Sequence, residues 1–391
     1  MNNKILIYIG LCTILLTGCW DKVEMQDLSI VTAAAIDRLE DGKTRISIQI
    51  FIPRSITSGE TGEDLSSGST FVREGVGNSL AEAISKLQFN VPRTLFWSHC
   101  KIYIFGEELA KEGIRDEADY IARHPGLRGS AFLFVSEGEA RELVSLIPPL
   151  ERYSAEALRK LTEHEPSMIT SLRDVDMGLM GDSESISLPY IKKLIPKDEA
   201  RKPHETIPVI NGTAIFKKDK MVGTLNLHDT NSLLWLKKGV KQSTISIKPD
   251  GDDKEIILST TSEKHTFIPQ IKDNRWIMDI KIDMEGDIIQ NETNLDLLNE
   301  VVLQKIQKKF DKSLEEKISK TIKELQLTYN ADVVHFARRF HQKFPDEWKK
   351  EKNNWDEKFK ELEVNIKVNT KIKRPGYIGP PAGLPREEVK E

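Results

Sequence analysis

Hydrophobic and polar residues follow two periods along the chain, and these periods predict a mixture of strands and helices. Alternating or continuous apolar runs predict strands at Ile30–Asp37, Thr44–Ile52, Lys101–Phe105, Ser130–Val135, Val209–Phe216, Met221–Leu227, Ser243–Lys248, Glu255–Thr260, Thr266–Ile271 and Arg275–Met284. Turn-forming residues at 40–43, 217–220, 249–252 and 273–274 join neighbouring runs, which predicts antiparallel hairpins. Apolar residues at helical spacing predict helices over Ser79–Gln88, Glu107–Glu112, Asp116–Arg123, Glu137–Ser145 and 151–163.

The longest predicted helix opens the C-terminal part of the chain. Its apolar residues recur every four positions, at Leu298, Val302, Ile306, Phe310, Leu314, Ile318 and Ile322. A four-residue step drifts by about 40° per turn around an α-helix, so this stripe must wind around its partner. We therefore expect the helix to pack on a sheet and not to form a straight coiled coil.

Two shorter helices and a closing strand are predicted after the long helix. One helix covers Asn330–Phe344, and the next carries Trp348, Trp355 and Phe359 on one face, where we expect the two tryptophans to pack in a core. Apolar residues alternate from Val364 to Ile372, which predicts a strand.

These elements predict an α+β fold with three mixed α/β domains, largely antiparallel sheets and a long amphipathic helix in the last domain. The stretch Leu188–Pro208 contains four prolines and is expected to be a linker. Residues 55–69 are expected to form a flexible loop. The predicted boundaries are a signal peptide at 1–18, an N-terminal α/β domain at 19–200, a middle β-rich domain at 201–290, a C-terminal helix-rich α/β domain at 291–375 and a flexible tail at 376–391.

The amino terminus has the pattern of a bacterial lipoprotein signal. Lys4 precedes twelve apolar or small residues, Ile5–Leu16, which as a helix would span only about 18 Å and so could not cross the ~30 Å hydrocarbon core. Leu16, Thr17, Gly18 and Cys19 then resemble a lipobox. This resemblance implies cleavage after Gly18, a diacylglycerol thioether on the Cys19 sulfur and N-acylation, which together would tether the chain to a membrane without spanning it.

Composition and charge narrow the function classes. The 391 residues include 30% charged side chains and three cysteines, with a formal net charge of −4, which argues against a polytopic membrane protein, a disulfide scaffold and nucleic-acid binding. Cys12 would leave with the signal peptide. Charge is unevenly distributed along the chain, because the formal net charge is −9 for residues 20–200 and +6 for residues 301–391. One end of the protein could therefore face acidic partners or lipid headgroups, although solvated helix faces explain the same pattern.

No motif with the spacing of a catalytic, cofactor or metal site stands out. His335 and His341 lie six residues apart, which does not fit the i, i+4 spacing of a helical zinc site. Adjacent residues such as His99 and Cys100 would point to opposite faces of a strand. A group of three aspartates, Asp250, Asp252 and Asp253, fits a hairpin turn better than a calcium loop, and the carboxylates of Asp174 and Asp176 have no visible partner base. We expect no enzyme activity, no cofactor and no metal.

Several blocks resemble spore germination lipoproteins of the GerC type. They are Cys19-Trp20-Asp21 with Glu24, Arg93–Phe96 with His99–Ile102 and Phe105–Ala110, Gly212–Lys217 with Val222–Leu225, and Pro345, Trp348 and Trp355 before an alternating strand. These blocks keep their order over roughly residues 19–375. The resemblance implies a noncatalytic subunit of a nutrient germinant receptor with three α/β domains, anchored through Cys19 to the outer face of the spore inner membrane. Its implied partners are integral membrane subunits of the A and B types.

A substrate-binding lipoprotein of a membrane transporter is the main alternative function. It would use the same lipid anchor. The chain lacks the long alternation of strands and helices expected for two doubly wound lobes, which disfavours this alternative. An anchored hydrolase is a third hypothesis, supported only by the carboxylates and the His99–Cys100 pair named above.

Overall fold

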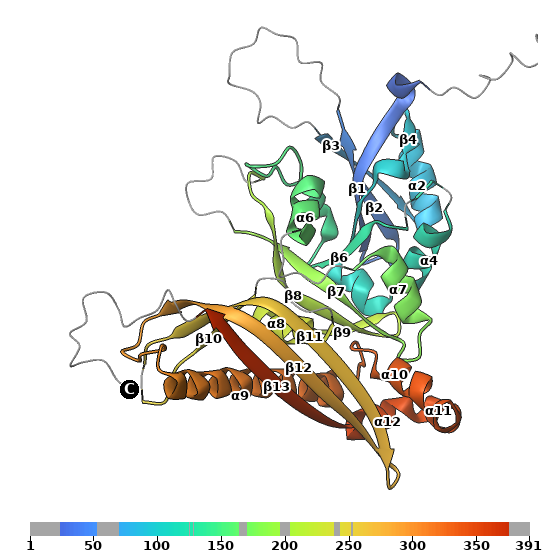
Figure 1. Ribbon diagram of the computed structural model, residues 1–391. Helices are drawn as coiled ribbons and strands as arrows, with labels where there is room; N and C mark the ends of the chain where they lie inside the picture. The colour runs from blue at the N-terminus through green and yellow to red at the C-terminus, as the bar shows by residue number, and fades with distance from the viewer. Residues whose placement is uncertain are drawn as a thin grey trace, which may run out of the picture.

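The computed structural model describes residues 24–52, 70–124, 126–127, 129–163, 170–195, 204–237, 243–251 and 253–374, in two sheets covered by helices (Figure 1). The larger sheet has the strand order β3-β2-β1-β5-β6-β7-β8-β9, with β4 paired to β1. Its strands are β1 (Leu28–Arg38), β2 (Thr44–Phe51), β3 (Thr70–Gly77), β4 (Thr94–Phe96), β5 (Ile102–Phe105), β6 (Phe132–Ser136), β7 (Ser185–Lys193), β8 (Pro208–Lys217) and β9 (Lys220–Asn226). The centre, β1-β5-β6-β7, is parallel, and antiparallel ladders flank it on both sides.

Both faces of the parallel centre are buried, so alternate residues of one strand enter different cores. On β5, Tyr103 and Phe105 belong to one core, whereas Ile102 and Ile104 belong to the other. The first core is covered by α2 (Leu80–Phe89), α3 (Glu107–Glu112), α4 (Arg115–Arg123) and α7 (Leu172–Leu179). The second core is covered by α5 (Ala140–Val144) and α6 (Ser154–Glu163).

The smaller sheet belongs to the C-terminal part and has the order β10-β11-β12-β13. Its strands are β10 (Thr244–Ile247), β11 (Ile256–Lys272), β12 (Arg275–Asn291) and β13 (Glu363–Arg374). The accompanying helices are α9 (Glu300–Glu324), the π-helical turn η3 (Leu325–Tyr329), α10 (Phe336–Lys343), α11 (Pro345–Glu351), the 3-10 turn η4 (Lys352–Asn354) and α12 (Trp355–Glu361). Trp348 and Trp355 are each 3% exposed in one core, as predicted.

The two sheets share a core through β8, β9 and the helix α8 (Leu227–Lys237). On β8, Ile215 packs into the C-terminal core, while its neighbours Ala214 and Phe216 pack into the first core of the larger sheet. Helix α8 is buried along most of its length, including Leu233 and Leu236 at 0% exposure, which is typical of a helix enclosed on all sides.

Helix α9 packs on the smaller sheet through its four-residue stripe from Val302 onward, whereas Leu298, the first residue of the predicted stripe, lies before the Asn299 N-cap and is 62% exposed. Val302, Ile306, Phe310, Leu314, Ile318 and Ile322 are all buried. Four helical residues advance about 6 Å and two strand residues about 6.6 Å. A four-residue repeat on the helix therefore stays close to register with alternate residues of a strand beside it.

This register lets side chains of α9 accept hydrogen bonds from the backbone N–H groups on the free edge of β13. Gln307 Oε1 accepts a hydrogen bond from the Ile372 backbone N–H at 2.9 Å. Asp311 Oδ1 accepts one from Thr370 at 2.7 Å, and Glu315 Oε1 one from Val368 at 2.9 Å. An uncovered edge strand would offer these groups to another chain, so this side-chain ladder protects the sheet.

Most of the predicted elements are confirmed, including the four hairpins and the long helix, and so is the mixed fold with largely antiparallel sheets. The linker predicted over Leu188–Pro208 is wrong at its start, because β7 runs through Pro189 to Lys193. Pro189 lies before the short ladder with β6, which begins at Tyr190, so its missing N–H removes no bond from that ladder. Because β7 pairs with β8, the larger sheet continues past residue 200; the predicted domain boundaries remain a prediction.

Two predicted helices differ from the structure. The helix predicted over Asn330–Phe344 begins only at Phe336, because Asn330 and His335 have left-handed φ values of 47° and 61°. The helix with the two tryptophans is divided into α11 and α12 by η4. The predictions for 1–18, Cys19, 55–69 and 376–391 lie outside the described residues.

Candidate functional site

The predicted lipid attachment site, Cys19, lies outside the described residues, but its place in the sequence relates it to one end of the larger sheet. Strand β1 begins at Leu28, nine residues after Cys19. Fully extended, nine residues span at most about 32 Å. Cys19 therefore lies no more than about 32 Å from the start of β1, whatever path the intervening residues take.

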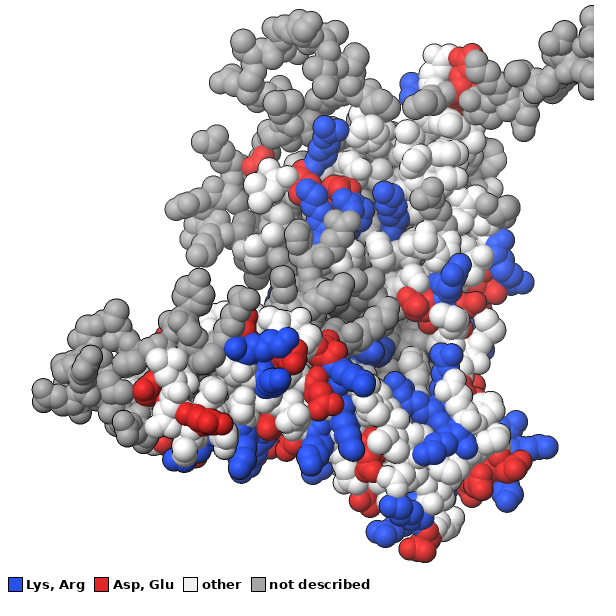
Figure 2. Space-filling view, viewed as in Figure 1, with Lys and Arg blue, Asp and Glu red and all other residues white. Residues whose placement is uncertain are grey.

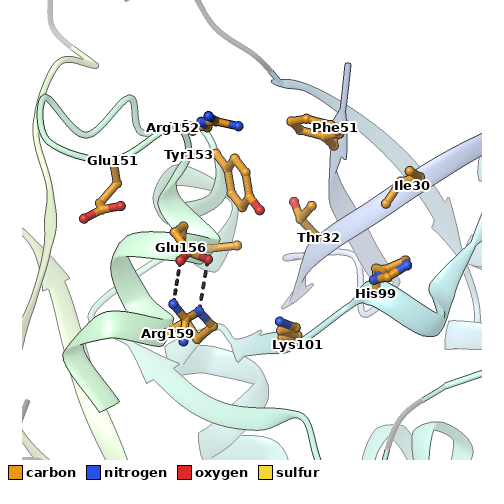
Figure 3. A pocket seen from close by; sticks show the side chains of 11 residues that line it. Ile30, Thr32, Phe51, His99, Lys101, Glu151, Arg152, Tyr153, Glu156 and Arg159 are labelled. Carbon is orange, nitrogen blue, oxygen red and sulfur yellow. Dashed lines mark hydrogen bonds and ion pairs between the residues drawn. The ribbon is translucent and has the colours of Figure 1, made fainter. Parts of the chain in front are cut away.

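A cavity of about 470 Å³ opens between the larger sheet and α6. Figure 3 shows its lining, with the rings of Phe51 and Tyr153 on one side and Lys101 with a Glu156–Arg159 pair on the other. The full lining is Ile30, Thr32, Phe51, His99, Lys101, Glu151, Arg152, Tyr153, Ala155, Glu156 and Arg159. Its volume falls within the range of ordinary small-molecule sites, roughly 300–1,000 Å³.

Gln49 fixes the cavity wall by joining β2 to the start of α6. Its side chain is 1% exposed, and its Nε2 donates hydrogen bonds to Val144 O at 2.8 Å and Ser154 Oγ at 3.0 Å. Its Oε1 accepts a hydrogen bond from Thr32 Oγ1 at 3.0 Å. A buried amide with both ends satisfied holds its neighbours in one arrangement.

The charged side chains of the cavity are mostly paired with one another. Arg159 donates to both carboxylate oxygens of Glu156, at 3.0 and 2.6 Å, and this pairing lowers the pKa of Glu156. Glu151 accepts from Lys160 at 2.6 Å. Lys101 has no hydrogen bond or ion pair from its side chain within the described residues, although its charge also lowers the pKa of Glu156.

The His99–Cys100 pair does not form a nucleophilic site. These residues lie at the end of the 3-10 turn η2 (Trp97–His99) and not on a strand. The Cys100 thiol is fully buried, and burial raises its pKa to about 12, so the thiolate is not available near neutral pH. The imidazole of His99 instead packs against Phe96, with ring centroids 5.5 Å apart.

Four of the remaining candidate groups, Asp174, Asp250, His335 and His341, have structural partners. Asp174 completes a capping box with Ser171 at the start of α7, and Asp250 pairs with Lys309. His341 Nδ1 lies 3.0 Å from Asp182, and His335 Nδ1 lies 3.0 Å from Ser183 Oγ. Within the described residues, no three His, Cys, Asp or Glu side chains form a group that could hold a metal ion.

Sequence patterns did not bring the cavity residues together. Lys101, Tyr153 and Arg159 belong to segments that meet only through the pairing of β1 with β5 and the packing of α6 on the sheet. The i, i+3 spacing of Glu156 and Arg159 was the one visible signal, and it is shared by ordinary exposed helices.

None of the described helices is both long enough and apolar enough to cross a bilayer.

Comparisons with known proteins cover nearly the whole chain. The family model described as "Spore germination protein N-terminal domain" matches residues 21–193, and "Spore germination B3/ GerAC like, C-terminal" matches residues 211–376. Spore germination protein KC of Bacillus subtilis (strain 168) is 27% identical over 95% of each chain. Spore germination protein B3 of the same organism is 23% identical, over 93% of this chain and 96% of its own.

A solved structure confirms the fold. The crystal structure of the GerBC protein aligns with a TM-score of 0.58 at 20% identity, covering 87% of this chain and 96% of the other. Because both family domains are present, in order, the chain belongs to the GerC-type family of spore germination proteins.

Proposed function

We propose that this protein is a lipid-anchored, noncatalytic subunit of a nutrient germinant receptor, required for the assembly of that receptor. The observation that carries the proposal is the match of both family domains to spore germination proteins, in a chain whose lipobox ends at Cys19. Its proposed partners are integral membrane subunits of the A and B types. Its proposed location is the extracytoplasmic face, which in spores is the outer surface of the inner membrane.

The anchor would orient the body with the start of β1 toward the membrane. Figure 1 places α9 at the opposite end of the molecule from the start of β1. In Figure 2, lysine and arginine side chains lie among aspartate and glutamate side chains over this lower end. On α9, exposed lysines outnumber exposed acidic residues, with Lys305, Lys308, Lys312, Lys320 and Lys323 against Glu300 and Glu316. A basic surface so far from the anchor is better placed for acidic segments of partner proteins than for lipid headgroups.

The anchor is tested by Cys19→Ala, with Cys100→Ala as the matched control that removes a buried thiol unrelated to lipid. We expect Cys19→Ala to move the protein from the membrane to the soluble fraction of spores and to slow germination on nutrients. Cys100→Ala should remain in the membrane fraction. Normal membrane retention and normal germination of the Cys19 variant would refute the proposal.

The alternative of a transporter's substrate-binding lipoprotein has less support. Such proteins are expected to have two doubly wound lobes, whereas the described residues form one mixed sheet and one four-stranded sheet with a shared core. Co-purification from spores separates the two functions. A receptor subunit should bring down the A-type and B-type membrane subunits, and recovery of a transporter in their place would favour the alternative.

A further inference from the structure

We propose that the cavity between α6 and the larger sheet binds a small amphiphilic anion. The anionic group of this ligand would lie at Lys101, and its apolar part would lie against Phe51 and Tyr153. The inference rests on the cavity itself and holds whether or not the protein is a receptor subunit.

Lys101 supplies the charge that selects an anion. Its backbone is fixed on both sides, since its N–H donates to Thr32 O at 3.3 Å and its C=O accepts from Phe132 N at 2.8 Å. The nearby carboxylate of Glu156 already accepts two hydrogen bonds from Arg159. The exposed Lys101 side chain forms no hydrogen bond or ion pair within the described residues and acts on Glu156 only through its charge, so its amine is accessible to an anion that enters the cavity.

The opposite wall is apolar and fits a hydrocarbon segment. Phe51 and Tyr153 pack with ring centroids 5.9 Å apart, and the apolar residues Ile30 and Ala155 also line the cavity. Burial raises the pKa of Tyr153, so its hydroxyl keeps its proton and can donate a hydrogen bond. Figure 3 shows this hydroxyl directed into the space between the two walls. A ligand with both a charged and an apolar part would use both walls, whereas a bare inorganic anion would use one.

The site is formed before any ligand binds. The four hydrogen-bonding partners of the Gln49 side chain, which are Thr32, Val144, Ser154 and Ala155, hold α6 against β2, so little ordering is needed on binding. The cavity volume of about 470 Å³ accommodates an acidic group with a short hydrocarbon chain. Such a ligand could be a free carboxylic acid or the headgroup region of an acidic phospholipid.

The test uses the full-length protein in phosphatidylcholine nanodiscs, titrated with sodium hexanoate by isothermal titration calorimetry. Hexanol represents the apolar half of the ligand, and inorganic phosphate represents the anionic half. We expect hexanoate to bind at least about tenfold more tightly than hexanol, which lacks the charge for a charge-assisted hydrogen bond, and than phosphate, which lacks the hydrocarbon chain. Lys101→Gln should weaken hexanoate binding by a similar factor, while the exposed control Lys349→Gln should not change it.

A second set of nanodiscs distinguishes the two sources of ligand. Discs that contain phosphatidylglycerol should compete with hexanoate if the natural ligand is a lipid headgroup, and should leave its affinity unchanged if the ligand is a free acid. Absence of hexanoate binding, or equal binding by Lys101→Gln and the wild type, would overturn the proposal. Equal affinity for phosphate and hexanoate would overturn the apolar half of it. Loss of the anchor in Cys19→Ala bears on the proposed function alone, so the two failures are distinguishable.

Discussion

Replacing Asp311 by leucine tests whether α9 stabilises the edge of the smaller sheet. The Asp311 carboxylate accepts the Thr370 N–H at 2.7 Å, and Thr370 is only 4% exposed. Leucine would keep a good helix former at this position but would leave that N–H without an acceptor. An unsatisfied, largely buried backbone donor costs about 1–3 kcal/mol, so we expect the free energy of unfolding to fall by about 2 kcal/mol.

The matched control is Asp311→Asn, which keeps an acceptor oxygen at the same place. Asparagine is the poorer helix former by a few tenths of a kcal/mol, so intrinsic propensity alone would make the control less stable than the leucine variant. The hydrogen bond predicts the opposite order. Because helix propensity and the hydrogen bond predict opposite orders of stability for the two variants, their comparison distinguishes the two effects.

Urea denaturation followed by tryptophan fluorescence provides the measurement, because Trp276 and Trp355 lie in the same core as α9. The same comparison at Glu315, whose carboxylate caps Val368, should give an effect of similar size. A leucine variant at Asp311 that is as stable as the asparagine variant, or more stable, would refute the role of the ladder.

Two further predictions concern buried titratable groups. Burial raises the pKa of Asp332 from 3.8 to about 6, so the native state binds this proton more tightly than the unfolded chain, and the group's contribution to stability is lost as pH rises from about 4 to 6. Burial also lowers the pKa of His335 from 6.5 to about 3, and the contribution of that group to stability is lost as pH falls, so the Asp332 effect is measured as a difference from the wild type. Relative to the wild type, Asp332→Asn should gain about 2 kcal/mol of unfolding free energy between pH 4 and pH 7, and parallel pH profiles of the unfolding free energy from urea denaturation would contradict this. Cys100 should not react with Ellman's reagent in the native protein and should react fully in 6 M guanidinium chloride, because burial raises the pKa of its thiol; rapid labelling of the native protein would show that the site opens.

Local signals predicted the elements where the chain itself carries the geometry. The hairpin between β1 and β2, the start of α2 at Ser79 and the turn at Asp273–Asn274 each depend on a few neighbouring residues, and each was predicted. The loop before α10 was not, because its conformation depends on Asp332. That carboxylate accepts hydrogen bonds from Phe336 N at 2.9 Å and Ala337 N at 2.8 Å inside a core assembled from distant segments.

The four-residue stripe of α9 shows how sequence and tertiary structure divide the information. The sequence by itself predicted that this helix buries one stripe against a sheet, and it carries the lipobox-like pattern that ends at Cys19 and the order of the family blocks. Only the tertiary structure decided that Gln307, Asp311 and Glu315 would cap one strand edge, and that Lys101 would face Phe51 and Tyr153 across a cavity. Periodicity records which face of an element is buried, whereas a site made from separate elements depends on which distant segments pack together.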